Sequence, residues 1–124
     1  MLVSPHGSVD LKPLLIPPSE VEEAQKHANS FEHKIEMTSR ELSDLLMLGM
    51  GAYTPLDGFM GYRDWQGVCE EMKTSTGVFW PIPITLSVNE EVVNDIKIGD
   101  DVALTDDNGR VNGQITVQEI YQID

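Results

Sequence analysis

Apolar residues recur at helical spacing in two segments of the first half of the chain, and each segment follows a sequence signal typical of a helix start. Ser19 and Glu22 have the spacing of a capping box, in which each side chain bonds the other residue's backbone N–H, and they predict a helix of about three turns. The weak apolar stripe of that helix consists of Val21, Ala24, Ala28 and Phe31. Thr38 and Glu41 repeat the box before a stronger stripe, so a second helix is predicted to run until Gly51 ends it.

A segment rich in turn residues, 52–61, follows the second helix and precedes a third. One proline and two glycines at turn spacing predict a defined loop, which Tyr53, Phe59 and Met60 would pin to the core. The third helix is predicted over residues 62–73, where four residues with the helical period should form a buried stripe. They are Trp65, Val68, Cys69 and Met72.

From residue 78 the apolar period changes from helical to alternating, which predicts a strand over residues 78–88. Its apolar face would consist of Trp80, Ile82, Ile84, Leu86 and Val88. Pro81 and Pro83 cannot donate ladder hydrogen bonds, so the first half of this strand is expected at a sheet edge or a bulge. Asn89 can cap a short helix over residues 90–95.

A hairpin is predicted near the end of the chain. Its first strand covers residues 102–105, and its partner is expected to run to about Tyr121. The Asn-Gly pair at 108–109 tolerates the positive φ angles of a two-residue type I′ turn. A second Asn-Gly pair at 112–113 indicates a bulge in the partner strand.

Length and charge narrow the classes of function. A chain of 124 residues and 13.8 kDa fits one domain. Its 8 lysines and arginines stand against 21 acidic residues, a formal net charge of −13 that repels nucleic acid and anionic lipid headgroups. No apolar run is long enough to span a membrane, and the single cysteine, Cys69, cannot form an internal disulfide. With no export signal at its start, the protein is expected in the cytoplasm.

No constellation of residues predicts a catalytic, cofactor-binding or metal site. Acidic residues stand in neighbouring doublets at positions 22–23, 70–71, 90–91, 100–101 and 106–107. Adjacent side chains on a helix point about 100° apart, so these doublets are interpreted as solvated surface, and the stretch 106–119 as a hairpin and not a calcium loop. His6, His27 and His33 lack metal-ligand spacing and a nucleophile elbow. Cys69 is interpreted as a small buried hydrophobe, and the glycines match no phosphate-binding loop.

Six segments form a pattern of their own: Ser4-Pro5-His6-Gly7, Arg40 to Leu45, Gly51 to Gly61, Trp80 to Leu86, Gly99 to Asp106, and Glu119-Ile120-Tyr121. In this order and spacing they resemble the N-terminal domain of ATP sulfurylase, sulfate adenylyltransferase, nearly from end to end. The loop followed at the right distance by Trp-Pro-Ile-Pro is the most specific part. Ser8 departs from the pattern, because the family often has another glycine there.

The resemblance implies an α+β fold, a small, mostly antiparallel PUA-like β-barrel with flanking helices, over residues 1–124 and without the last segment of the domain. In the family a later catalytic domain transfers the adenylyl group of ATP to sulfate, giving adenosine 5′-phosphosulfate and pyrophosphate, with magnesium escorting the nucleotide. The Gln-x-Arg-Asn motif of that domain does not occur in this sequence. The resemblance therefore implies an inactive chain without a cofactor, whose partners are the catalytic domain of the same enzyme and further copies of that enzyme.

Within this expectation, His6 and the loop from Tyr53 to Gly61 are the candidate functional residues. The loop either braces the second helix against the barrel or forms part of the interface with the catalytic domain. Two other functions stay open, a free-standing PUA-like module that binds RNA and a scaffold that docks on an intact sulfurylase. RNA binding is disfavoured because the 8 basic residues are scattered singly and form no stripe.

Overall fold

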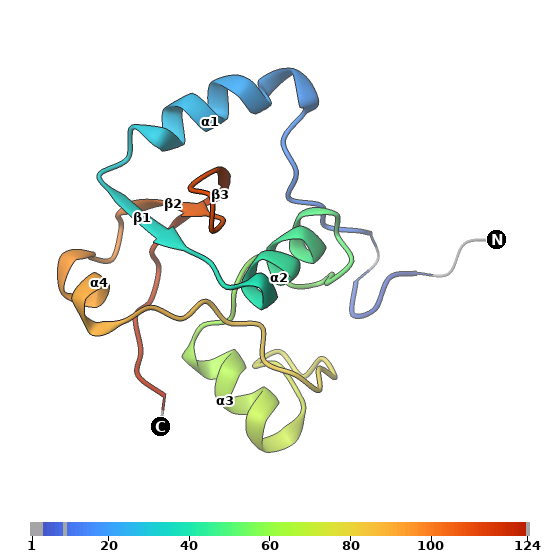
Figure 1. Cartoon of the computed structure of the whole chain (residues 1–124). Helices are drawn as coiled ribbons and strands as arrows, with labels where there is room; N and C mark the ends of the chain where they lie inside the picture. Colours follow the sequence, from blue (N-terminus) through green and yellow to red (C-terminus); the bar gives the residue numbers. More distant parts are fainter. Residues whose placement is uncertain (1–3, 9, 124) are drawn as a thin grey trace. The chain divides into compact units, whose positions relative to one another are not determined.

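The computed structural model describes residues 4–8 and 10–123 (Figure 1). The chain divides into two compact units, each made of two stretches of sequence. We call residues 1–15 with 43–86 the first unit, and residues 16–42 with 87–124 the second unit. The boundary between residues 42 and 43 falls inside helix α2 (Ser39–Gly49), so each unit contains part of that helix.

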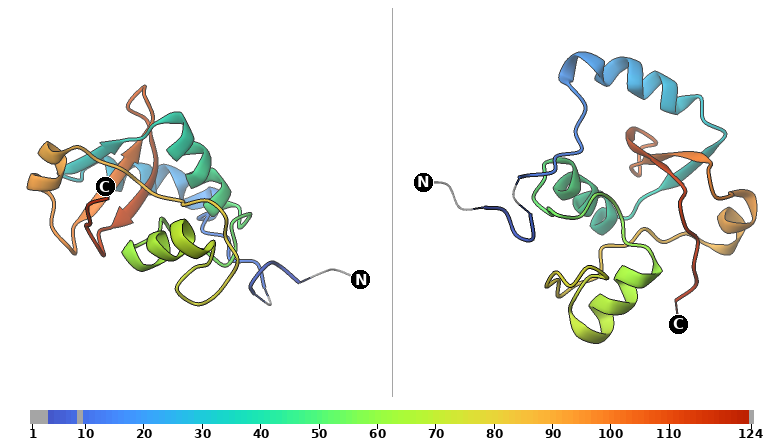
Figure 2. Two further views of the ribbon diagram at one scale, coloured as in Figure 1. Left: turned by 90° about the horizontal axis from the view of Figure 1, so that it is seen from below. Right: turned by 180° about the vertical axis from the view of Figure 1, so that it is seen from behind.

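The second unit contains a three-stranded sheet with a helix packed on it (Figures 1 and 2). Its elements are η1 (Pro18–Glu20), α1 (Val21–Asn29), β1 (His33–Glu36), α4 (Glu90–Asp95), β2 (Asp101–Thr105) and β3 (Val111–Thr116). The strand order is β1-β2-β3, with β1 parallel and β3 antiparallel to the central strand. Helix α1 contributes Ala28 to a small buried cluster with Ala103 and Val111, against which Phe31 packs.

The sheet is mixed and open, so the closed, mostly antiparallel barrel expected from the sequence is not found in the part of the chain that the structure describes. The departure comes from β1, which pairs in parallel with β2 from His33 opposite Val102 to Glu36 opposite Thr105. The sequence analysis missed this strand because only Ile35 in it is apolar, and that side chain alone is buried. The α+β class is confirmed.

The predicted hairpin joins β2 to β3, but its turn differs in type. Gly109 has a φ of 80°, whereas Asn108 does not adopt positive φ, so a two-residue type I′ turn is wrong. The N–H of Gly109 donates to the carbonyl of Asp106 (3.0 Å), and the N–H of Asp106 donates to that of Arg110 (3.0 Å). This pattern is a three-residue loop that closes on a left-handed glycine. Hydrogen bonds to the Asp106 carboxyl hold its pKa below its usual value. The bond from the Arg110 N–H has the largest effect.

The bulge predicted beside the turn is confirmed. Leu104 lies opposite Gly113 and Thr105 opposite Val111, which leaves Asn112 as the extra residue. The partner strand ends at Thr116 and does not reach Tyr121, although Val117 still bonds the backbone of the chain before β2.

The first unit is built around an apolar core between α2 and α3 (Tyr62–Glu71). The core residues are Leu48, Leu56, Met60, Val68, Trp80 and Ile84, with Tyr53 and Phe59 packed against them. Gly51, with a φ of 81°, ends the second helix as predicted, because its N–H and that of Ala52 turn back to the last carbonyls of α2.

The strand predicted over residues 78–88 is wrong. The segment has no regular strand, only an isolated bridge between Lys73 and Phe79. Trp80 and Ile84 are buried, four residues apart, whereas Ile82 between them is 55 % exposed. Pro81 and Pro83 lack the N–H that a ladder needs, and the segment is held instead by single backbone bonds such as Met60 N–H to the Ile84 carbonyl (2.7 Å).

The buried stripe predicted on the third helix is only partly confirmed. Val68 is buried and Trp65 half-buried, but Cys69 and Met72 are exposed. Helix α3 ends at Glu71, and Met72 adopts a left-handed conformation with a φ of 56°, which takes its side chain off the helical face. The interpretation of Cys69 as a buried hydrophobe is therefore wrong. It follows the buried Val68 on the helix and points to the exposed side.

Two of the three predicted helix caps are confirmed. Thr38 and Glu41 exchange both bonds of a capping box, and the Asn89 side chain accepts from the Val92 N–H (3.0 Å) at α4. The box predicted at Ser19 is wrong, because residues 18–20 form a 3₁₀ turn and α1 starts after it without a side-chain cap. Pro18 at the start of that turn pre-sets the backbone and moves Ser19 inside the turn.

Candidate functional site

The loop from Tyr53 to Gly61, the candidate named from the sequence, turns its apolar side chains inward. Leu56 and Met60 are buried in the core of the first unit, and Tyr53 and Phe59 pack against it. Tyr53 meets the Trp80 ring edge-on, with the centroids 5.5 Å apart. These contacts favour the brace over the interface, because side chains spent on internal packing are not available to a partner.

Hydrogen bonds tie the same loop to its neighbours in the first unit. The Thr54 hydroxyl donates to the Gly51 carbonyl (2.7 Å) and accepts from the Lys12 N–H (3.0 Å). The Tyr53 hydroxyl donates to Oδ1 of Asp44 on α2 (3.2 Å). Asp44 is buried, and a buried carboxylate needs hydrogen-bond partners. The Tyr53 hydroxyl is one partner of Asp44.

Burial of the Tyr53 phenol, then the charge of Asp44 and its hydrogen bond, raise the pKa of Tyr53 above its usual value of 10.0. A raised pKa in the folded state means that this tyrosine favours folding below its unfolded pKa, and that the benefit is lost as pH rises through the folded pKa. We expect the wild-type chain to lose more stability than Tyr53→Phe between about pH 8 and pH 11, measured by urea unfolding. Asp44→Asn should lower the pKa of the phenol, followed by its ultraviolet absorbance. A parallel decline of the wild type and Tyr53→Phe would contradict this assignment.

His6, the second candidate, is held by the backbone. Its Nε2 lies 2.7 Å from the Phe79 carbonyl oxygen and so donates to it, and its ring lies 6.0 Å from that of Trp80. A nitrogen that donates to a carbonyl cannot act as a base at the same time. The adjoining Gly7 has a φ of 66°, and a Cβ there would stand 3.0 Å from Val78 Cγ1, so this turn requires glycine. Ser8 fits its own position, where its hydroxyl donates to the Asp10 carbonyl (2.9 Å).

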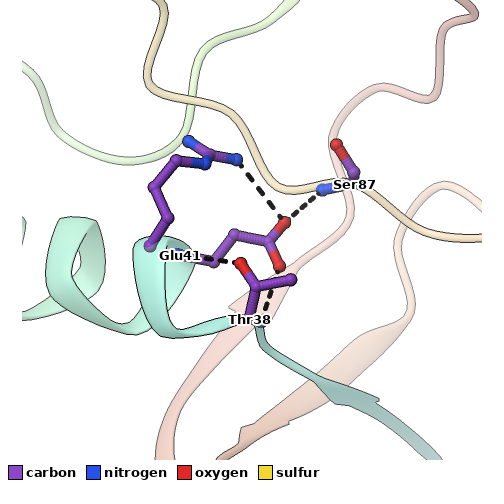
Figure 3. A network of polar contacts seen from close by, with 4 residues as sticks. Thr38, Glu41 and Ser87 are labelled. Carbon is purple, nitrogen blue, oxygen red and sulfur yellow. Dashed lines mark hydrogen bonds and ion pairs between the residues drawn. The ribbon is translucent and has the colours of Figure 1, made fainter.

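A buried carboxylate in the second unit, which the sequence analysis did not single out as a site, joins two segments of the chain (Figure 3). Glu41 is 2 % exposed. Its Oε1 accepts from the Thr38 N–H (2.9 Å) and its Oε2 from the Ser87 N–H (2.6 Å), with Arg40 at 4.0 Å. The capping-box spacing revealed the first bond, but the bond to Ser87 joins residues 46 positions apart and has no local signal. The group fastens two segments and contacts no open space.

A polar hollow of about 530 Å³ is also present in the second unit, lined by Glu32, His33, Asp95, Lys97 and Asp100. His33 Nε2 lies 3.7 Å from Asp100 Oδ2. Among residues 4–8 and 10–123, no three His, Cys, Asp or Glu side chains gather as metal ligands would. The acidic doublets are exposed or half-buried, as expected for solvated surface.

The helices were also compared with the length and hydropathy of a membrane span. None of those in the described part of the chain has the length and apolar character needed to cross a membrane.

Comparison with known proteins identifies the family to which this fold belongs. The sequence profile of the PUA-like domain family matches residues 3–124. The chain belongs to this family. The sulfate adenylyltransferase of Psychrobacter sp. is 50 % identical over 127 residues, which are 99 % of this chain and 30 % of that relative. The sulfate adenylyltransferase of Syntrophobacter fumaroxidans is likewise 50 % identical over 125 residues, with the same two shares.

The solved structure of a hexameric APS kinase from Thiobacillus denitrificans shares the PUA-like fold, with a TM-score of 0.82 and 32 % identity over 100 % of this chain and 24 % of that one. The predicted resemblance to sulfate adenylyltransferase is thereby confirmed for the PUA-like domain. The chain spans about 30 % of the length of the curated relatives that it matches.

Proposed function

We propose that this chain is the non-catalytic N-terminal domain of a sulfate adenylyltransferase, whose parent converts ATP and sulfate to adenosine 5′-phosphosulfate and pyrophosphate. The observation that carries the proposal is the 50 % identity over nearly all of this chain to proteins of that name, of which it matches only 30 %. A domain so similar in sequence is expected to keep the same place in the same kind of polypeptide.

The charges of the chain support a non-catalytic role. Adenylyl transfer needs cations and aimed donors that stabilise the charge on the phosphates. With 8 basic residues against 21 acidic ones, this chain supplies a field of the wrong sign. We therefore assign ATP and its magnesium to the catalytic domain of the parent.

The proposed partners are that catalytic domain and further copies of the parent. Assembly is supported by the hexameric state named for the structural neighbour. We place the parent in the cytoplasm, because an exposed free thiol such as that of Cys69 suits a reducing compartment.

A second parent is favoured by one observation. The structural neighbour is an APS kinase, so a PUA-like domain of this shape also occurs in a protein of that name. Its lower identity, 32 % against 50 %, makes it the second candidate. A free-standing binding or scaffold module is the third.

The formation of ATP from adenosine 5′-phosphosulfate and pyrophosphate tests the proposal. We expect no ATP from the chain alone. A hybrid in which the chain replaces the matching segment of the Psychrobacter sulfate adenylyltransferase should form ATP within about tenfold of the unmodified relative, since the catalytic groups are untouched. Turnover by the chain alone, or an inactive hybrid beside an active relative, would contradict the proposal.

A further inference from the structure

Large apolar side chains are exposed at several places in the first unit, Met72, Phe79 and Ile82 among them, but two segments far apart in sequence bring theirs together. Residues 11–15, a strap without regular structure, expose Leu11, Leu14 and Leu15 by 62 %, 47 % and 67 %. At the C-terminal end of α2, Leu46 and Met50 are 52 % and 55 % exposed. We call these five residues the strap face.

The strap is fastened to α2 at the end where Leu46 and Met50 lie. The Leu14 N–H donates to the carbonyl of Gly49 (2.8 Å), and a Cβ on Gly49 would stand 3.0 Å from Leu15 Cδ2. The Met50 N–H donates to the Leu46 carbonyl (3.0 Å), which sets these two residues one turn apart on the same side. Figures 1 and 2 show the strap passing this end of the helix. The exposure of the five side chains is therefore part of a fixed arrangement.

A cluster of exposed leucines on a segment that is fixed by hydrogen bonds indicates a surface that another protein covers. The 53–61 loop, the other candidate for an interface in this unit, turns its apolar side chains into the core. Lys12 is the charged residue of the strap itself. Burying the strap face would thus remove apolar area from water with few charges to desolvate.

We propose that the strap face is the surface on which this chain docks against the remaining polypeptide of a sulfate adenylyltransferase, an inference that rests on the function proposed above. In relatives of which this chain matches 30 %, more than twice its own length is joined to it covalently. Covalent attachment gives the neighbour a high effective concentration at the face. A second copy of the chain is a poorer occupant, because two chains with a formal charge of −13 each repel one another.

The chain offers a matched pair of methionines as probes. Met50 in the strap face is 55 % exposed and Met72, outside it, is 54 % exposed. Oxidation by hydroxyl radicals, read by peptide mass spectrometry, is compared between the 124-residue chain and its hybrid with the Psychrobacter relative. We expect Met50 to oxidise about fivefold more slowly in the hybrid and Met72 to change less than about twofold, since oxidation follows exposure. In the hybrid, Leu46→Glu should restore oxidation of Met50, whereas Ile98→Glu, at a site 70 % exposed in the second unit, should not.

The formation of ATP by the same hybrid separates the two proposals. An active hybrid with Met50 unprotected would overturn the strap face and leave the proposed function standing. Protection of Met50 in an inactive hybrid would support the strap face and contradict the function. Equal protection of Met72, or protection of Met50 in the chain alone that grows with concentration, would overturn the assignment, the latter in favour of a second copy.

Discussion

Glu41→Ala is expected to lower the free energy of unfolding by about 3 kcal/mol, because it leaves two backbone donors without an acceptor in a buried place. These donors are the N–H groups of Thr38 and Ser87, which the carboxylate holds at 2.9 and 2.6 Å. Arg40 adds little, since its side chain is exposed and 4.0 Å away. The measurement is urea unfolding followed by circular dichroism.

Two controls isolate this effect. Glu23→Ala removes an exposed carboxylate from α1 and should change the free energy of unfolding by less than about 0.5 kcal/mol. Glu41→Gln keeps one oxygen acceptor but not the second, so it should fall between the wild type and Glu41→Ala. If Glu41→Ala were as stable as Glu23→Ala, the carboxylate would not be fastening the two segments.

Leu48→Ala is expected to cost about 3 kcal/mol, since it opens a cavity in the core of the first unit. Leu48 is 2 % exposed and packs in a cluster with Trp80 and Ile84. Leu46, two residues earlier on the same helix, is 52 % exposed, and Leu46→Ala should cost less than about 1 kcal/mol. Thermal unfolding of the two variants compares them directly. Equal losses would mean that the strap face is packed as tightly as the core.

Local signals in the sequence predicted local structure well. The capping residues Thr38 and Asn89 bond the predicted N–H groups, and Gly51 turns the chain out of α2. Each of these depends on side chains within four positions of one another, so spacing alone carries the information. The bulge at Asn112 has the same origin.

Long-range packing decided the features that were mispredicted. The alternation from residue 78 to 88 is typical of a strand, but Pro81 and Pro83 withhold donors and the segment buries only every fourth side chain. Strand β1 was missed because its pairing with β2, 69 positions away, stabilises a stretch with little apolar content of its own. The burial of Cys69 was mispredicted because a periodic stripe indicates a helical face about 100° wide. The core covers the side of that face where Val68 lies and leaves Cys69 exposed.

The candidate site likewise combines a feature that local sequence signals predict with one that long-range packing decides. The 53–61 loop was found from its glycines and proline, but whether it braces or docks depends on what its side chains meet. The structure turns Leu56 and Met60 into the core and leaves the leucines of the strap outside, although both segments are similarly apolar in sequence. Exposure, together with the bond that fastens the strap to α2, and not composition, therefore identifies the surface proposed for docking.

The intact mass of the natural gene product that carries this sequence tests the central claim most directly. Since 13.8 kDa corresponds to 30 % of the sulfate adenylyltransferases that it matches, the account predicts a polypeptide of about 46 kDa. A mass of about 58 kDa would point to the architecture of the APS kinase, of which the chain matches 24 %. A product of 13.8 kDa would contradict the claim, because the cell would then make this domain without a catalytic partner in the same chain.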